Sequence, residues 1–354
     1  MRCARVVSLL LLLVLAGLLP GCGRVLEGDP PPPLPAPVAL PLERGTKELV
    51  IQVRVPGDGP AAVDLPMVVD SGLSGPVLLS AQTAAALGLR ARGIAVATGW
   101  GGMRLVRFTA LDRMEMGPVR LTRVPAAVMD LPDGVTRRAG RADIAGLLGA
   151  TLFRAYGVTV DVPAGTLTLS APGTMPVPPG AVVLPLAPGP LPAVTVAIDG
   201  MPVVLAVDTG ATADVVLSQA AARRLDLAGR YGPGRSGAAL SAAGTVTVTK
   251  RTVDTLSFGS PAHTSPAGTS PVTLHHVEVD VVGAGGGTLA ALLPGAGALP
   301  DGVDGVLGLG LLSQFRFTLE PGEGEAGRLV LLPLAGHDPT VWRRLLDQAP
   351  SPGG

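Results

Sequence analysis

The chain has 354 residues, and its 27 basic and 27 acidic side chains give a formal net charge of zero. A chain with no excess of positive charge lacks the electrostatic signature of binding to nucleic acid or anionic lipid, and nucleic-acid binding is excluded on this ground. Hydrophobic residues make up 47% of the chain, enough to bury a core, while 49 Gly and 36 Pro interrupt the apolar runs and favour short strands over long helices.

Residues 1–21 are predicted to be a targeting segment that is not part of the fold. Arg2 and Arg5 supply its positive end, and Val6–Leu19 is an uncharged apolar run that is short for a membrane span. A segment of this kind directs the protein out of the cytoplasm.

The junction Leu19-Pro20-Gly21-Cys22 resembles a bacterial lipoprotein signal, in which cleavage leaves a lipidated Cys at the mature N-terminus. This resemblance implies a lipid anchor at Cys22. Because Gly23 follows rather than Asp, it also implies a place in the bacterial cell envelope, at the outer membrane facing the periplasm. The alternative is an ordinary secretory signal in which Cys22 happens to fall. Cys3 leaves with the signal, so the mature chain has no intramolecular disulfide and no catalytic thiol.

Residues 22–42 are expected to form the lipidated Cys and a proline-rich tether. The stretch GRVLEGDPPPPLPAPVALPL contains repeated prolines, which remove backbone donors and favour an extended polyproline conformation. We therefore expect a spacer between the lipid and a folded body that begins at residue 43.

The rest of the chain matches itself in two places. VVDSGLSGPVLLS from Val68 aligns without a gap with AVDTGATADVVLS from Ala206, and both copies continue into a short helical pattern that begins after a serine. AGLLGA from Ala145 aligns in the same way with DGVLGL from Asp304, and this match extends to Asp161 and Glu320. The chain is therefore a tandem duplication with extra residues in its second copy.

Each copy begins with alternating strands that lead to an Asp. In the second copy Asp199-Gly200 predicts a tight hairpin, because this pair accepts the positive φ angles of a type I′ turn. The expected division is an N-terminal lobe at 43–171, a linker at 172–190, a C-terminal lobe at 191–336, and a C-terminal helix and tail at 337–354.

The chain contains two Asp-Ser/Thr-Gly triplets with the same pattern of hydrophobic residues around them. Each is followed downstream by a hydrophobic-hydrophobic-Gly segment. Together these motifs resemble those of the aspartic proteases. More narrowly, AVDTGATADVVLS with DGVLGLGLLSQFRFTLE is similar to the bacterial retropepsin-like family, here with two lobes in one chain as in a pepsin. The resemblance covers about residues 46–334. It implies an all-β fold of two similar retropepsin/pepsin-like lobes related by a pseudo-two-fold axis, with short helices.

Asp70 and Asp208 are the expected catalytic pair, one from each lobe. Peptide hydrolysis without a covalent intermediate needs a water held between two carboxylates, one ionised and one protonated. Like charges about 3 Å apart cannot both ionise, so such a pair shares a proton. The resemblance therefore implies an aspartic endopeptidase that acts on a peptide or protein substrate, without a cofactor and as a monomer.

Four neighbouring residues are expected to support the two Asp loops. The hydroxyls of Ser71 and Thr209 can hydrogen-bond across to the partner loop and hold both carboxylates in plane. Gly72 and Gly210 permit a tight turn and a close approach of the two backbones.

Leu73 departs from the family pattern, which has a small or hydroxyl residue at this place, as Ala211 is in the second copy. Two outcomes stay open at this point. Leu73 either packs under the loop as part of the core, or crowds the water beside Asp70 and leaves a protein that binds peptides without cleaving them.

A substrate-covering flap is expected at Gly99, Trp100, Gly101 and Gly102, which resemble the glycine-rich flap tip of retropepsins. An unrelated turn with a partly buried Trp is the alternative. The second copy has small residues and no aromatic at the corresponding place, so the two flaps would be unequal.

No metal site is expected. His275 and His276 are adjacent in a strand-like run, LHHVEVD, so they point to opposite faces and do not readily share one ion. Three functions remain open: a membrane-anchored aspartic endopeptidase, a non-catalytic peptide-binding envelope lipoprotein on the same fold, and a structural envelope lipoprotein.

Overall fold

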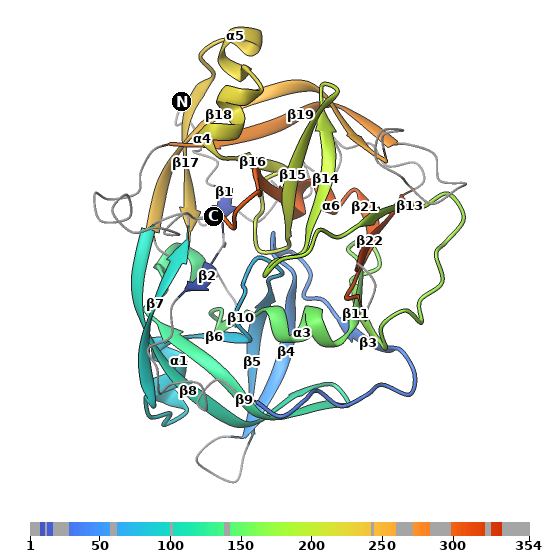
Figure 1. Cartoon of the computed structure of the whole chain (residues 1–354). Helices are drawn as coiled ribbons and strands as arrows, with labels where there is room; N and C mark the ends of the chain where they lie inside the picture. Colours follow the sequence, from blue (N-terminus) through green and yellow to red (C-terminus); the bar gives the residue numbers. More distant parts are fainter. Residues whose placement is uncertain are drawn as a thin grey trace, which may run out of the picture.

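The computed structural model describes residues 8–10, 13–16, 28–56, 62–99, 102–137, 142–241, 244–259, 272–283, 299–322 and 327–334. These residues form three β-sheets and several short helices. Two of the sheets build one lobe each, and the third lies between the lobes (Figure 1). The predicted all-β fold of two similar lobes with short helices is confirmed.

The sheet of the first lobe has eight strands, and β8 also pairs with β9, so that the sheet curls back on itself. In spatial order they are β2 (Leu13–Ala16), β7 (Gly93–Gly99), β8 (Gly102–Met116), β4 (Val50–Pro56), β5 (Ala62–Val69), β10 (Gly146–Leu148), β6 (Val77–Ser80) and β9 (Val119–Met129). Strand β4 shows why these sequences form strands. Val53 and Val55 are buried while Arg54 between them is exposed, because alternate residues share one face of a strand.

The second lobe repeats this arrangement strand for strand. Its order is β1 (Ser8–Leu10), β17 (Arg235–Ser241), β18 (Gly244–Phe258), β14 (Ala193–Ile198), β15 (Met201–Asp208), β20 (Gly305–Gly308), β16 (Val215–Leu217) and β19 (Val272–Val282), with β18 again paired to β19. The internal duplication in the sequence therefore corresponds to a duplication in space.

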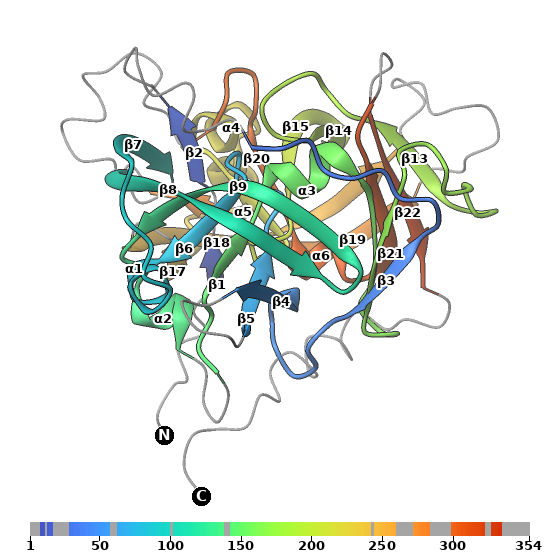
Figure 2. The same ribbon diagram turned by 90° about the horizontal axis from the view of Figure 1, so that it is seen from below.

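The third sheet joins the lobes through six strands. Four of them, β3, β13, β21 and β22, lie together on the right of Figure 2. Their order is β13 (Val182–Pro185), β22 (Arg328–Pro333), β21 (Phe315–Glu320), β11 (Gly157–Asp161), β12 (Thr166–Ser170) and β3 (Val38–Pro41). At its centre Thr159 pairs with Thr318, and their hydroxyls lie 2.8 Å apart. The two threonines are equivalent residues of the duplication, so the pseudo-two-fold axis passes between them.

Several segments that were expected to lie outside the lobes contribute strands. β3 comes from the expected tether and β13 from the expected linker, and each is an edge strand of the joining sheet. Edge strands tolerate proline because one side of the strand needs no backbone donor, which explains why proline-rich segments pair here. The tether also contacts the first lobe upstream of β3, where Asp29 forms an ion pair with Arg123 and the Tyr156 hydroxyl donates to the Pro32 carbonyl at 2.8 Å.

The predicted targeting segment supplies two further strands. β1 runs parallel to β17, and β2 runs antiparallel to β7, so each adds to the edge of one lobe's sheet. Cys22 lies outside the described residues, as do 337–354, where a C-terminal helix and tail are expected.

The helices are short, and none of the described ones is long and apolar enough to cross a membrane. They are α1 (Ala81–Ala86), α2 (Asp133–Thr136), α3 (Ala150–Ala155), α4 (Gln219–Arg224), α5 (Leu227–Tyr231) and α6 (Leu309–Leu312). The two predicted serine caps are confirmed. Ser80 accepts a hydrogen bond from the Thr83 amide at 3.0 Å, and Ser218 accepts one from the Ala221 amide at 3.1 Å.

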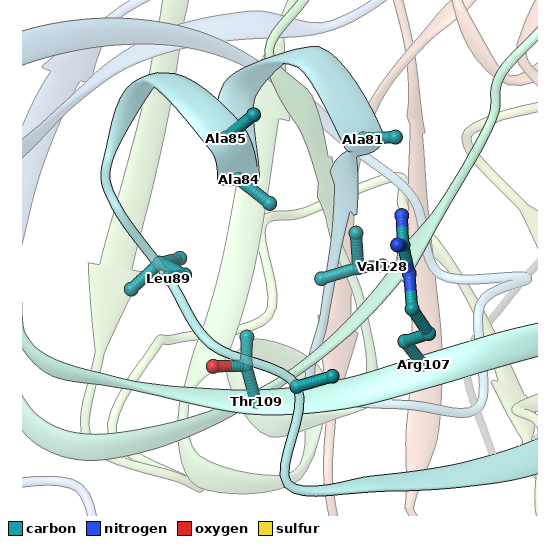
Figure 3. Close-up of a pocket in the computed structure, with 8 residues that line it drawn as sticks. Ala81, Ala84, Ala85, Leu89, Arg107, Thr109 and Val128 are labelled. Atoms are coloured by element: carbon teal, nitrogen blue, oxygen red, sulfur yellow. The ribbon is translucent and has the colours of Figure 1, made fainter.

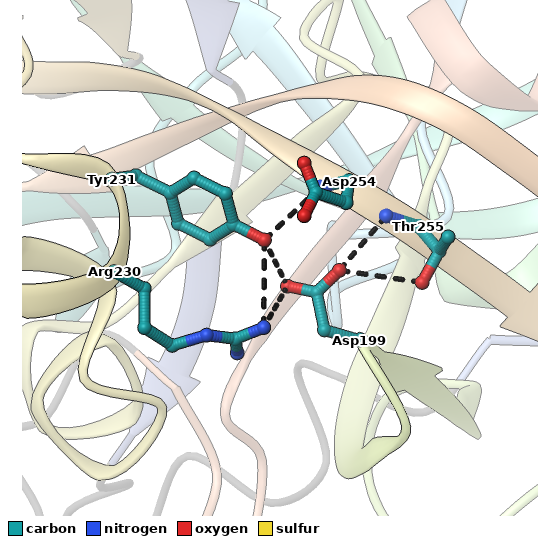
Figure 4. Close-up of polar contacts among 5 residues, drawn as sticks. All are labelled: Asp199, Arg230, Tyr231, Asp254 and Thr255. Carbon is teal, nitrogen blue, oxygen red and sulfur yellow. Dashed lines mark hydrogen bonds and ion pairs between the residues drawn. The ribbon is translucent and has the colours of Figure 1, made fainter.

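The predicted Asp199-Gly200 turn between β14 and β15 is also confirmed, since both residues have positive φ angles. The Asp199 side chain also links this turn to other parts of the second lobe (Figure 4). Asp199 accepts hydrogen bonds from the Thr255 amide at 2.8 Å and the Tyr231 hydroxyl at 2.6 Å, and it pairs with Arg230 at 3.1 Å. This network attaches α5 to the sheet of the second lobe.

Candidate active site

The two Asp loops begin where a strand of each lobe ends beside a parallel neighbour. Asp70 follows β5, and its amide donates to the Leu148 carbonyl of β10 at 2.8 Å. Asp208 is the last residue of β15 and pairs with Gly308 of β20. Both Asp side chains are fully buried. The same local sequence pattern therefore places both carboxylates at equivalent points of the two lobes.

Hydroxyl groups tie the two loops together across the lobes. The Ser71 amide donates to the Thr209 hydroxyl, and the Thr209 amide donates to the Ser71 hydroxyl, both at 3.0 Å. The Ser71 hydroxyl donates to the Val207 carbonyl at 2.6 Å, and the Thr209 hydroxyl donates to the Val69 carbonyl at 2.8 Å. These four buried hydrogen bonds form a symmetric lock that holds each loop against the other.

The glycines after the hydroxyl residues allow the loops to approach closely. A Cβ atom on Gly72 would lie 2.4 Å from the carboxyl carbon of Asp208, and one on Gly210 would lie 2.5 Å from that of Asp70. No real Cβ contact is that short, so any larger residue would push the opposite carboxyl group away. Each glycine thus keeps the carboxylate of the other lobe in place.

Each carboxylate is held by amides of its own loop through one oxygen. Oδ1 of Asp70 accepts from the Gly72 amide at 2.9 Å, and Oδ1 of Asp208 accepts from the amides of Gly210 at 2.9 Å and Ala211 at 3.2 Å. The Oδ2 atoms of both Asp residues have no hydrogen-bond partner among the described residues. Buried polar atoms without partners are rare, and a catalytic role is one of the reasons for which proteins retain them.

The electrostatics of the pair favour a shared proton. Burial raises the pKa of Asp70 well above its usual range, and the nearby charge of Asp208 raises it further. Burial also raises the pKa of Asp208, to about 7, against the opposing effects of the neighbouring Asp70 carboxyl and of the Gly210 amide. Because neither carboxyl ionises readily beside the other, the pair keeps a proton at a pH where ordinary carboxyls are ionised.

The expected flap lies on the hairpin of β7 and β8. Gly99 pairs with Gly102 at the end of this hairpin, while Trp100 and Gly101 lie outside the described residues. The corresponding hairpin of the second lobe, β17–β18, reaches the first lobe through Leu240, which packs near Val135 of α2. The second hairpin therefore extends from one lobe to the other.

Leu73 is part of the core of the first lobe. Its side chain is 1% exposed and packs in an apolar cluster with Val68, Leu78 and Phe108. Ala211, at the equivalent place, is buried in a corresponding cluster of the second lobe. Of the two outcomes considered for Leu73, the structure supports packing under the loop.

We expect Leu73→Ala to lower the free energy of unfolding by about 2–5 kcal/mol without raising peptidase activity, because the change leaves a cavity in this cluster. Thermal or denaturant melts beside a peptidase assay measure both effects. Val177→Ala, at a half-exposed position, is the matched control and should change neither. A Leu73→Ala protein of unchanged stability and higher turnover would show that Leu73 crowds the site instead.

The sequence did not reveal an ion pair within the second lobe. The Lys250 ammonium lies 2.8 Å from Asp280, which is 1% exposed, and 3.1 Å from Glu278. By strand register, Lys250 and Asp280 are the counterparts of Phe108 and Ala127 in the first lobe. Strand β19 pairs with β16 only at Val279–Val281, so among the described residues the stretch around His275 pairs with β18 alone, and His275 and His276 are exposed. An alignment of the two copies along these strands would have shown that the second copy has charged residues where the first has apolar ones.

Comparison with known proteins gives the following similarities. A family model described as "Aspartyl protease" matches residues 51–152 and 194–311, which include both Asp loops. The solved structure of an aspartic proteinase from Irpex lacteus is 15% identical with a TM-score of 0.48, covering 85% of this chain and 98% of that one. That of a retropepsin-like aspartic protease from Rickettsia conorii is 16% identical with a TM-score of 0.27, covering 43% of this chain and 98% of that one. No curated protein matches the chain.

Proposed function

The chain belongs to the aspartyl protease family, and from this premise we propose that it is an aspartic endopeptidase with Asp70 and Asp208 as its catalytic residues. The observation that carries the proposal is the symmetric lock of Ser71 and Thr209, which holds one buried carboxylate from each lobe against the other. Two unrelated aspartates in turns would need neither this lock nor the two glycines that make room for the opposite carboxyl group.

The proposed reaction uses a water held between the two carboxyl groups. The ionised carboxylate accepts a proton from the water, whose oxygen forms a bond to the peptide carbonyl carbon, while the protonated carboxyl donates to the carbonyl oxygen. Collapse of the tetrahedral intermediate breaks the C–N bond. The carboxyl that took the water's proton donates it to the departing amine, and the other carboxylate takes a proton back from a hydroxyl of the intermediate as the carbonyl re-forms. Each turnover consumes one water and returns the pair to its singly protonated state.

The substrate would be a peptide or protein segment bound between the lobes and covered by the β7–β8 hairpin. One chain contributes both Asp loops, so we propose that the monomer is the catalytic unit. The unequal hairpins of the two lobes would give an asymmetric binding site.

A digestion experiment tests the proposal. The protein is incubated with a mixture of peptides, with and without a pepstatin-like inhibitor, and products are identified by mass spectrometry. We expect cleavage that the inhibitor abolishes. Peptide binding without cleavage would instead select the non-catalytic peptide-binding protein, and neither binding nor cleavage would favour a structural envelope protein.

We also propose that the protein is anchored in the bacterial envelope through a lipid on Cys22, at the outer membrane facing the periplasm. The support is the charged end, the apolar run and the Leu-Pro-Gly-Cys junction of the first 22 residues, followed by Gly23.

Cys22→Ala should therefore release the protein from the membrane fraction or leave its precursor unprocessed. Cell fractionation and mass spectrometry of the mature N-terminus measure this, with Cys3→Ala as the matched control because Cys3 leaves with the signal. An unmodified mature N-terminus in the wild-type protein would defeat the proposed anchor.

A further inference from the structure

The outer face of the β7–β8 hairpin exposes two large apolar side chains. Ile94 is 54% exposed and Leu105 is 69% exposed. Ile94 pairs with Arg107, and Leu105 lies two residues before Arg107 on β8, so all three side chains share one face of the hairpin. The opposite face carries Val106 and Phe108, which are buried in the core of the first lobe.

The second lobe shows that the fold does not require this apolar face. The β17–β18 hairpin has the same strand lengths and register, with Arg235 paired to Lys250 where Gly93 is paired to Phe108. On this alignment Ile94, Leu105 and Arg107 correspond to Ser236, Thr247 and Thr249. The copy that shares the architecture thus has small polar residues where the first lobe has two aliphatic residues and an arginine.

Positive charge accompanies the apolar side chains. Arg90 and Arg92, which lead into β7, are exposed like Arg107, and none of the three forms an ion pair with a described residue. Elsewhere on the same sheet, Glu115 neutralises the neighbouring arginines of β8 and β9. This part of the surface is therefore basic, although the net charge of the whole chain is zero.

A shallow hollow continues this surface toward α1 (Figure 3). It has a volume of about 100 Å³ and lies away from the Asp pair. Ala81, Ala84, Ala85 and Leu89 line it, with the Arg107 side chain beside them. An apolar hollow with a guanidinium beside it suits a molecule that has an apolar part next to an anionic group.

We propose that this face, composed of Ile94, Leu105, Arg107, Arg90 and Arg92 and called the docking face below, rests on the surface of an anionic phospholipid bilayer. Aliphatic side chains enter the boundary between headgroups and acyl chains, while guanidinium groups bind phosphates. Two aliphatic side chains bury far less than the roughly 1,200 Å² of a stable protein interface. A bilayer fits this face better, because binding to it adds the attraction between cationic side chains and anionic lipid to the buried apolar area.

The N-terminal segment reaches the first lobe, which carries the docking face. Gly28 packs against Arg123 and Pro125 of β9, in the same sheet as the docking face. Five residues lie between Cys22 and Gly28, so a lipid on Cys22 would keep the first lobe within about 20 Å of the bilayer. The proposed binding of the docking face to a bilayer depends neither on that lipid nor on catalysis by the Asp pair.

The test uses the processed chain with Cys22→Ser, so that neither the apolar signal nor an acyl group binds lipid. Its partitioning is measured by sedimentation with vesicles of phosphatidylcholine and phosphatidylglycerol, and with vesicles of phosphatidylcholine alone. The hairpin variant I94S/L105T/R107T introduces the residues that the second lobe has at these places. The control variant V63T/V177S/R316T makes the same kinds of change at exposed positions elsewhere.

We expect the unsubstituted docking face to bind the anionic vesicles, more weakly at high salt, and the hairpin variant to bind them at least about tenfold more weakly while the control binds as before. Thermal melts of both variants establish that they are folded. Absence of binding to anionic vesicles, or equal binding by the hairpin and control variants, would overturn the proposal. So would a dimer in sedimentation velocity that the hairpin variant alone disrupts, because the face would then bind a second copy.

Discussion

Asp208→Asn is expected to reduce peptide hydrolysis by at least about 10²–10⁴-fold while the protein stays folded, because an amide cannot accept the proton of the attacking water. Asp70→Asn should have the same effect, since the two residues are equivalent members of one pair. Asn retains an oxygen that accepts from the loop amides at Gly72 and Gly210, so the symmetric lock should survive. The measurement is kcat/KM on a peptide that the wild-type protein cleaves.

Asp130→Asn is the matched control for this result, because Asp130 is exposed and lies at the end of β9, outside both Asp loops. Its activity should equal that of the wild type. Substantial hydrolysis by either Asp70→Asn or Asp208→Asn, in a protein that melts at the wild-type temperature, would mean that the reaction does not use the shared pair.

The second large effect is a loss of stability as pH rises. The pKa of Asp208 is about 7 in the folded protein against about 3.8 when unfolded, so the folded state holds the proton more tightly. A group shifted in this direction stabilises the fold fully below its unfolded pKa, and that contribution disappears as pH rises through its folded pKa. Asp70 is shifted in the same direction. We expect the free energy of unfolding to fall by a few kcal/mol, as an order of magnitude, between about pH 4 and pH 8.

Denaturant melts at several pH values measure this loss, and Asp208→Asn removes the contribution of Asp208. Asn does not ionise, so the variant should lose less stability than the wild type over the same range and should be the more stable of the two at pH 8. Parallel pH profiles for the two proteins would contradict the shared-proton description.

The duplication explains how much of the site could be predicted from the sequence. The stretches around Asp70 and Asp208 align without a gap, and the matching strand patterns before them locate both loops at strand ends. Such a signal is local and occurs twice, so it indicates both lobes and a pair of loops between them. The structure then brings together Ser71 and Thr209 in the same way on both sides.

Features that depend on distant pairing were not predictable in this way. The strands β3 and β13 lie in proline-rich stretches whose composition indicates a tether and a linker, and only their partners β12 and β22 show that they are strands. The Lys250–Asp280 pair joins two long strands at positions where the other lobe has apolar residues. The docking face could not be predicted from composition, because the net charge describes the whole chain. Which residues lie side by side on a surface depends on the strand register.

A mixing experiment with the two inactive variants tests most directly the claim that one chain contributes both halves of one catalytic pair. Asp70→Asn and Asp208→Asn are combined in equal amounts, and peptidase activity is compared with that of the wild type at the same total concentration. We predict that the mixture stays as inactive as either variant, while wild-type activity per molecule is unchanged on dilution. Recovery of a substantial fraction of wild-type activity in the mixture would show that the pair forms between chains and would contradict this account.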